Sequence, residues 1–220
     1  MPDQYPMRIN KYLALKKIST RRGADVLVGE KKVFINGKLA VLGSKVKEND
    51  KVEVKGVEEK KYQYFAYNKP IGIETDSPQE GLFPLGRLDK ASHGLLIVTN
   101  DGRITDQLLN PKYVHEKEYV VRTLNKLRSS FKQKMEAGVD IEGYMTKKCK
   151  VKIIDEFNFR IILTEGKKHQ IRRMCSNLFQ EVADLKRERI MNIKLGNLKS
   201  GGLREIKGEE LSTFLKSIGF

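Results

Sequence analysis

The residues best suited to chemistry lie in one stretch, in which Arg87 and Asp89 flank a single leucine. On an extended backbone, residues two apart share a face, so the guanidinium would lie beside the carboxylate. The apolar run 95–98 that follows is typical of a buried strand, and Asn100-Asp101-Gly102 indicates a turn. A carboxylate held beside a guanidinium at a strand end could do chemistry or form a structural ion pair, and the spacing fits both.

Four motifs, in order, resemble those of the pseudouridine synthases, in the branch that modifies bacterial ribosomal RNA. One is GRLD at 86–89, followed by SHGLLIVTNDG at 92–102. The others are YNKPIG at 67–72, KEY at 117–119 and LTEGKKHQIRRM at 163–174. With a matching N-terminal region, the resemblance covers nearly the whole chain, and four ordered motifs are far more specific than one.

Composition predicts a polyanionic partner. The chain has 220 residues and a formal net charge of +15, which by itself does not separate RNA from DNA or from an anionic membrane. No apolar run approaches the ~20 residues that span a bilayer, and the N-terminus has no signal-peptide core. Cys149 and Cys175 lack metal spacing, and the three histidines are far apart. We therefore expect a cytoplasmic protein with reduced thiols, no metal and no cofactor.

The N-terminal region predicts two helices followed by short strands. Residues 7–17 form an amphipathic pattern with a basic face, and 20–28 form a second helix with Ser19 as its N-cap. Val33–Ile35 leads into Asn36-Gly37, a strong hairpin signal, and 51–54 alternates as a strand.

This arrangement resembles the S4 RNA-binding domain. We expect that domain at 1–56, a polar linker at 57–61 and a catalytic domain at 62–220. The candidate RNA contacts of the first domain are Arg8, Lys11, Arg21 and Arg22; the alternative is an ordinary solvated basic face. Gly23 departs from the larger residue common in relatives.

The remainder mixes strands and helices without strict alternation, which predicts an α+β fold. The resemblance implies a large, mostly antiparallel sheet with the active cleft across its middle. The expected strands are 62–67, 95–98, 117–124, 149–154 and 159–163, the expected helices are 104–109, 126–137, 165–178 and 209–217, and further apolar segments are 182–185 and 190–195.

The reaction that the resemblance implies detaches uracil at N1 and reattaches it at C5, without redox change or energy input. Asp89 carries over as the catalytic carboxylate, which either attacks C1′ or removes the C2′ proton. Tyr119 carries over as the residue under the extruded base; without the family, a cross-strand core tyrosine is the better interpretation. Arg172 carries over as the partner that orients Asp89, and its alternative is a phosphate contact.

The resemblance also gives RNA-binding candidates around the cleft. Arg87 would hold the flipped nucleotide, or form a structural pair. Leu185 would pack against the target base, or serve as a core leucine. Lys168 and Arg173 are expected phosphate contacts, and Lys69 is expected to pack under the catalytic loop. His169 and Gln170 are expected to be structural supports.

The sequence HEKEY at 115–119 resembles that of the large-subunit enzyme of the F type, so 23S ribosomal RNA is the favoured partner. The alternatives are 16S RNA, a transfer RNA, or a non-catalytic ribosome-assembly factor bound to RNA or to an assembly particle. We expect a monomer, because bound RNA would occupy much of the surface.

Overall fold

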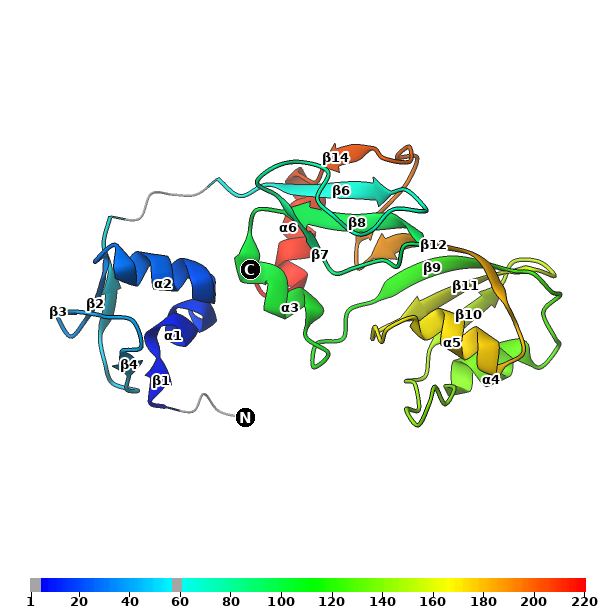
Figure 1. Cartoon of the computed structure of the whole chain (residues 1–220), viewed down its shortest axis with the longest axis horizontal. Helices are drawn as coiled ribbons and strands as arrows, with labels where there is room; N and C mark the ends of the chain where they lie inside the picture. The colour runs from blue at the N-terminus through cyan, green and yellow to red at the C-terminus, as the bar shows by residue number, and fades with distance from the viewer. Residues whose placement is uncertain (1–4, 57–60) are drawn as a thin grey trace. The chain divides into compact units, whose positions relative to one another are not determined.

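The computed structural model describes residues 5–56 and 61–220 (Figure 1). They form two compact units: one extends to Tyr62 and includes Asp101–Ile104, and the other comprises Gln63–Asn100 with Thr105–Phe220. Of the predicted linker, residues 57–60 lie outside the described part.

The N-terminal unit packs two helices against short strands. Its core residues include Ile9, Leu13, Ala24 and Val28. The hairpin turn is confirmed, since Asn36 and Gly37 both have positive φ, 51° and 75°. The elements are β1 (Met7–Arg8), α1 (Ile9–Leu15), α2 (Arg21–Gly29), β2 (Val33–Ile35), β3 (Lys38–Leu39), β4 (Lys45–Val46) and β5 (Val52–Val54).

The N-cap of α2 is Thr20, and the prediction of Ser19 was wrong. The Thr20 hydroxyl accepts a hydrogen bond from the Gly23 amide at 2.9 Å, as an N-cap side chain does. A side chain at Gly23 would overlap the Ser19 hydroxyl and approach Thr20 Oγ1 to 3.1 Å. A glycine at position 23 therefore leaves room for the Thr20 side chain to cap the helix.

Among the described residues, nine strands of the larger unit form one sheet. The pair β12–β8 is parallel and the other pairs are antiparallel. The expected α+β fold with a large, mostly antiparallel sheet is thus confirmed. The main path runs β10 (Lys150–Ile153), β11 (Asn158–Leu163), β9 (Lys117–Thr123), β12 (Val182–Ile190), β8 (His93–Thr99), β6 (Tyr64–Lys69) and β14 (Leu203–Glu205), with β13 (Ile193–Lys194) beside β12 and β7 (Phe83–Leu85) beside β8.

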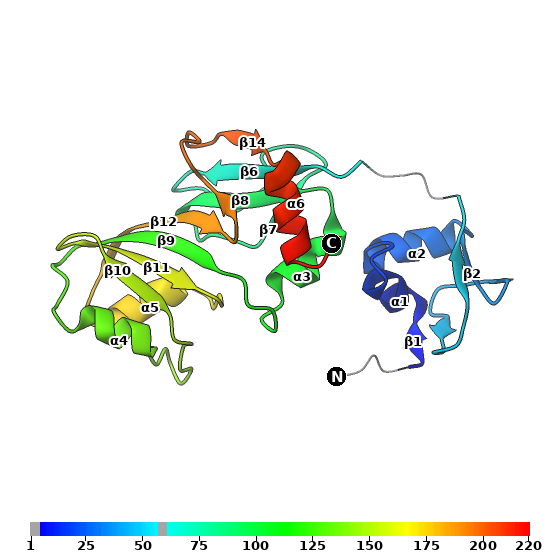
Figure 2. The ribbon, with the colours of Figure 1, turned by 180° about the vertical axis from the view of Figure 1, so that it is seen from behind.

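Helices cover the sheet at two places. In Figure 1, α4 (Phe131–Ala137) and α5 (Gln170–Asn177) lie together beneath β9 and β11. Their side chains Met135 and Met174 share one core with Val121 and Ile161 of these strands. Figure 2 shows α6 (Gly208–Ser217) lying across β6 and β8. The short helix α3 (Thr105–Leu109) follows a 3-10 turn at Gly102–Ile104.

Three predicted boundaries were wrong for identifiable reasons. Residues 126–130 are not helical, because the Leu127 amide bonds the carbonyl of Glu156, which lies in the turn between β10 and β11. Helix α5 begins at Gln170 and not at 165, since His169 before it is left-handed, with φ 51°. Residues 182–190 form one strand, because their charged middle pairs with neighbouring strands.

Candidate active site

A cavity of about 820 Å³ opens between the loop after β7, strands β9 and β12, and the segment that leads into α5. Its lining includes Asp89, Tyr119, Leu185 and Arg187, and every lining residue belongs to the larger unit. A second hollow, on the β10–β11 side, has Glu118 as the one carboxylate of its lining, and that carboxylate is already paired with Arg160. The first cavity is therefore the candidate active site.

Asp89 lies in the loop between β7 and β8, and this loop is held by the segment 70–75. The Thr75 hydroxyl donates to the Leu88 carbonyl at 2.7 Å and accepts from the Leu88 amide at 2.9 Å. The Gly72 amide donates to the Lys90 carbonyl, and the Ser92 amide donates to Asp89's own carbonyl. These bonds fix the backbone on both sides of the carboxylate.

Lys69 supports this arrangement from below. Its ammonium donates to the carbonyls of Pro70 and Ile73 at 2.8 and 2.7 Å, and the residue is fully buried. Burial lowers the pKa of Lys69, while the charges of Glu74 and Asp89 oppose that shift. Lys69 thus holds the segment under the loop that carries Asp89. Its ammonium is already engaged by two carbonyls, which does not support the direct RNA contact expected of it.

The expected ion pair between Arg172 and Asp89 is absent from the described structure. Arg172 instead donates to the carbonyls of Ala91 and Val182, at 2.9 and 3.2 Å, and lies 3.4 Å from the Ser92 hydroxyl. Its guanidinium is therefore engaged by the backbone just after Asp89. The imidazole of His169 takes the nearer position, with Nδ1 3.4 Å from Asp89 Oδ2.

The strands β9 and β12 form one wall of the cavity. Tyr119 on β9 is buried and lies opposite Arg187 on β12. Leu185 is likewise buried. It lies two residues before Arg187 on β12, opposite Val121. The structure thus brings Asp89, Tyr119 and Leu185 to a single cavity, which their sequence separation alone could not establish.

The remaining predicted contacts divide into two groups. Arg87 and Lys168 are exposed and line the cavity, where they could reach phosphate. Arg173 is turned away to another loop, with Nη2 2.9 Å from the Ile141 carbonyl and 2.7 Å from Glu142. The phosphate contact expected of Arg173 is not supported. In the N-terminal unit, Arg8, Arg21 and Arg22 are exposed and Lys11 is partly exposed.

Sequence reasoning missed Arg187 and Lys117, both of which line the cavity. Strict alternation along a strand would place Arg187 and Arg189 on the same face. The register of β12 against β9 shifts between these two residues, so that Arg187 lies opposite Tyr119 and Arg189 opposite Glu118. This bulge sends one arginine to the cavity and the other to the far face, and no sequence signal marks it.

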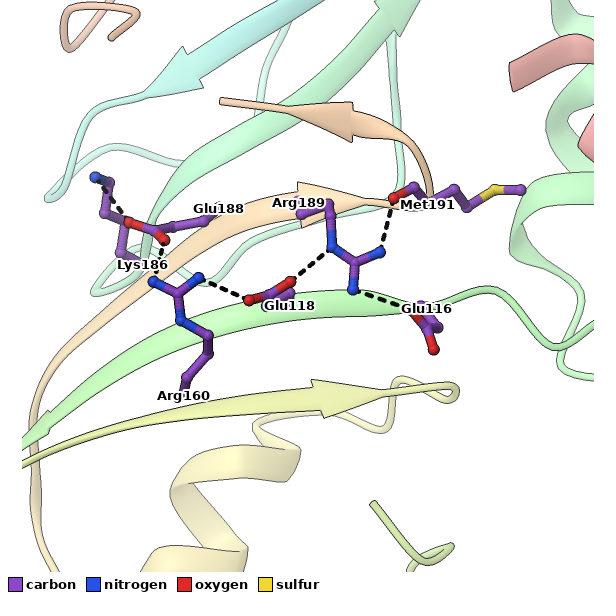
Figure 3. A network of polar contacts seen from close by, with 7 residues as sticks. All are labelled: Glu116, Glu118, Arg160, Lys186, Glu188, Arg189 and Met191. Carbon is purple, nitrogen blue, oxygen red and sulfur yellow. Dashed lines mark hydrogen bonds and ion pairs between the residues drawn. The ribbon is translucent and has the colours of Figure 1, made fainter. Parts of the chain in front are cut away.

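An ion network on the far face holds the bulge (Figure 3). Glu118 accepts from Arg160 Nη1 at 2.8 Å and from Arg189 Nε at 2.6 Å. Arg189 also bonds Glu116 at 2.9 Å, and Arg160 lies 3.2 Å from Glu188, the residue at the shift. Burial would raise the pKa of Glu118, but the bonds from Arg189 and Arg160 outweigh it and leave that pKa below its ordinary value.

Two features are absent from the part of the chain that the structure describes. No three histidine, cysteine or carboxylate side chains gather there in a way that could hold a metal ion. Within residues 5–56 and 61–220, no helix has the length and apolar content to cross a membrane.

Comparison with known proteins assigns both parts of the chain. Residues 63–177 match the family described as RNA pseudouridylate synthase, and residues 7–52 match the S4 domain. The dual-specificity RNA pseudouridine synthase RluF of Escherichia coli (strain K12) is 39% identical over 99% of this chain and 81% of its own length. The ribosomal large subunit pseudouridine synthase B of Bacillus subtilis (strain 168) is 32% identical over 93% of both chains. A crystal structure of a pseudouridylate synthase superposes with a TM-score of 0.69 at 25% identity, covering 96% of this chain and 99% of the other.

An S4 domain followed by this sheet and cavity defines an RNA-modifying enzyme. The chain belongs to the RNA pseudouridylate synthase family, in the RsuA, RluB and RluF branch, and is an isomerase whose partner is RNA.

Proposed function

We propose that this enzyme isomerises a specific uridine of 23S ribosomal RNA to pseudouridine, with Asp89 as its catalytic carboxylate. The observation that carries the assignment is the position of Asp89 in one cavity with Tyr119 and Leu185. Glu165, a buried carboxylate of that cavity, is engaged by the Tyr144 hydroxyl, the Lys147 amide and Gln170. Glu74 is exposed. Asp89 is therefore the carboxylate best placed to meet a ribose.

The geometry supports a division of roles. The carboxylate of Asp89 either attacks C1′ or removes the C2′ proton, and both routes release the base at N1. Tyr119 offers a ring face for the detached base, and Leu185 adds apolar contact beside it. Arg172 fixes the backbone at Ala91 and Ser92, so that the carboxylate keeps its orientation. Arg87 and Lys168 supply charge for phosphate.

The choice of 23S RNA follows from the relatives, since one of the two curated relatives above is named for the large subunit. The other is named dual-specificity, so transfer RNA is a second substrate to test, with 16S RNA a third. We further propose that residues 1–56 grip a neighbouring RNA element, that 57–61 link them to a catalytic domain at 62–220, and that the enzyme works as a cytoplasmic monomer.

The test uses RNA labelled with tritium at C5 of uridine, because forming the new bond at C5 expels that hydrogen. We expect the parent protein to release tritium from 23S RNA without metal or nucleotide. Asp89→Asn keeps the shape and loses the carboxylate, and it should release at least about 100-fold less. Mapping the product would name the modified position.

Other results would correct the proposal. Equal release by both proteins would remove Asp89 from its role. Release from transfer RNA or 16S RNA alone would reassign the substrate. Absence of release from all three RNAs, with salt-sensitive binding intact, would favour a ribosome-assembly factor instead.

A further inference from the structure

Arg187 is a buried cation in the wall of the cavity. The residue is 3% exposed, and its Nε donates to the Leu95 carbonyl at 2.7 Å. Its Nη2 is buried without a hydrogen-bond partner in the described structure. A buried guanidinium donor without an acceptor costs free energy, so this atom is a candidate for binding something that enters the cavity.

The position of Arg187 is set by close packing of backbones. Arg187 lies beside Gly94 in the one parallel strand pair of the described sheet, β12–β8. Gly94 has φ 103°, and a Cβ there would lie less than 3.0 Å from the Arg187 backbone. The glycine of the SHG segment thus allows β12 to approach β8 and brings the guanidinium to the cavity.

The surroundings of Arg187 lack an acidic partner. Within the described residues, neither Arg187 nor the neighbouring Lys117 has a carboxylate at ion-pair distance. The Lys117 amine reaches the His115 carbonyl only at 3.5 Å. Burial first, and then the charge of Arg187, lower the pKa of Lys117 to about 8. Two cations share one wall, which suits an electron-rich ligand.

The guanidinium also lies close to the expected site of the base. The Arg187 side chain is 6.0 Å from the centroid of the Tyr119 ring. A base stacked on that ring would therefore lie next to the Arg187 guanidinium.

We propose that Arg187 binds the detached uracil through a carbonyl oxygen and stabilises the negative charge that this base carries when the N1–C1′ bond breaks. This inference rests on the proposed function. When the bond breaks, its electron pair stays on the base and is shared between N1, O2 and O4. The base then forms the C5–C1′ bond with an electron pair of its own, the C5 proton leaves, and N1 takes up a proton, so that the product is an isomer of the substrate. Asp89 acts on the sugar. Arg187 acts on the base, as a hydrogen-bond donor that is already in position before the negative charge develops.

The test compares two substrates that differ in how readily the base departs. One RNA carries uridine at the target position and the other carries 5-fluorouridine, whose detached base is the better leaving group. With enzyme in excess, consumption of the target nucleoside in a nuclease digest gives the rate of the first turnover. Arg187→Lys keeps the positive charge but loses the fork of donors, and Arg187→Met loses both.

We expect Arg187→Lys to slow the reaction of uridine by about 100-fold and that of 5-fluorouridine by a smaller factor, with RNA affinity nearly unchanged. Because both rates come from the same folded protein, any loss of stability cancels in their ratio. Equal slowing of the two substrates would overturn the inference and leave Arg187 as a strut between β12 and β8. A loss confined to affinity would also overturn it, and would indicate a phosphate contact.

Two controls complete the design. Arg122→Met removes an exposed guanidinium from the outer face of β9, and it should change neither rate. The parent protein separates the two proposals: no turnover by the parent would overturn the proposed function together with this inference, whereas turnover with equal slowing overturns the role of Arg187 alone.

Discussion

At the scale of single residues, Arg172 lies near Asp89 in the fold but bonds the backbone beside it and not its carboxylate. Its guanidinium bonds the Ala91 carbonyl and lies near the Ser92 hydroxyl, two to three residues after Asp89. His169 lies nearer to the carboxylate, at 3.4 Å. A motif can identify the side chains of a site, but it does not say which atom each one binds, because that depends on where the neighbouring carbonyls lie.

Lys117 predicts a pH dependence of stability. Its pKa falls from an ordinary 10.5 to about 8, through burial and the charge of Arg187. Between these two values the unfolded chain keeps a proton that the folded chain has lost, so stability rises with pH in this window. Lys117→Met should therefore be more stable than the parent at pH 7, by on the order of 1–2 kcal/mol, with a smaller advantage at pH 9.5. Urea unfolding at both pH values measures this.

The control for Lys117 is Lys152→Met, which removes an exposed lysine from β10 and should show no such change. An advantage of Lys117→Met that is the same at pH 7 and pH 9.5 would mean that the amine is not desolvated as the structure indicates.

At the scale of elements, the parallel contact of β12 with β8 decides the shape of the active site. It joins Lys186 and Arg187 to His93 and Gly94, and the bulge on the other edge of β12 is held by the network of Glu118 and Arg189 (Figure 3). Both features act on Arg187, one on each side. The sheet therefore fixes this side chain more firmly than a surface loop could.

Gly94→Ala tests that contact. The new methyl group would meet the Arg187 backbone at less than 3.0 Å, and the backbone conformation at φ 103° disfavours any side chain. We expect a loss of about 3 kcal/mol or more in unfolding free energy, measured by urea titration. Gly166→Ala is the matched control, because a Cβ there meets nothing within 4 Å. A small loss at Gly94, similar to that at Gly166, would show that β12 can move away from β8 at little cost.

At the scale of the whole molecule, the chain carries a charge of +15 and divides into two compact units. The cavity with Asp89 and Tyr119 lies in the larger unit, while exposed arginines lie on the N-terminal unit. Phosphate contacts give affinity that falls with salt and carries little sequence information. We infer that the S4 domain contributes affinity and the cavity contributes chemistry.

The double substitution Arg21→Gln with Arg22→Gln should separate these contributions. Both residues are exposed at the start of α2. The slope of log affinity against log salt should fall by about 1 for each phosphate that the variant no longer binds, while the rate at saturating RNA stays unchanged. Lys32→Gln with Lys51→Gln is the charge-matched control, since these lysines already pair with Glu30 and Glu53. An equal decrease of the slope in both double variants would show that general charge, and not this helix, binds RNA.

The sequence by itself determined the family, the α+β class and most elements. These follow from local signals: apolar periodicity, the Asn36-Gly37 turn and the ordered motifs around Asp89, Tyr119 and Arg172. Each signal lies within a few residues, so it can be read without knowing what packs against it. The same locality explains the error at α4, because its start depends on a bond from the Leu127 amide to the Glu156 carbonyl, far along the chain.

Only the tertiary structure decided which side chains meet. The pairing of Arg173 with Glu142 and the bond of Arg172 to the Ala91 carbonyl both depend on chain segments distant in sequence. Arg187 depends on a bulge in β12, and a shift of one residue in register reverses the face to which a side chain points. Pairing between strands sets that register. For this reason the sequence motifs did not identify Arg187 as a residue of the cavity.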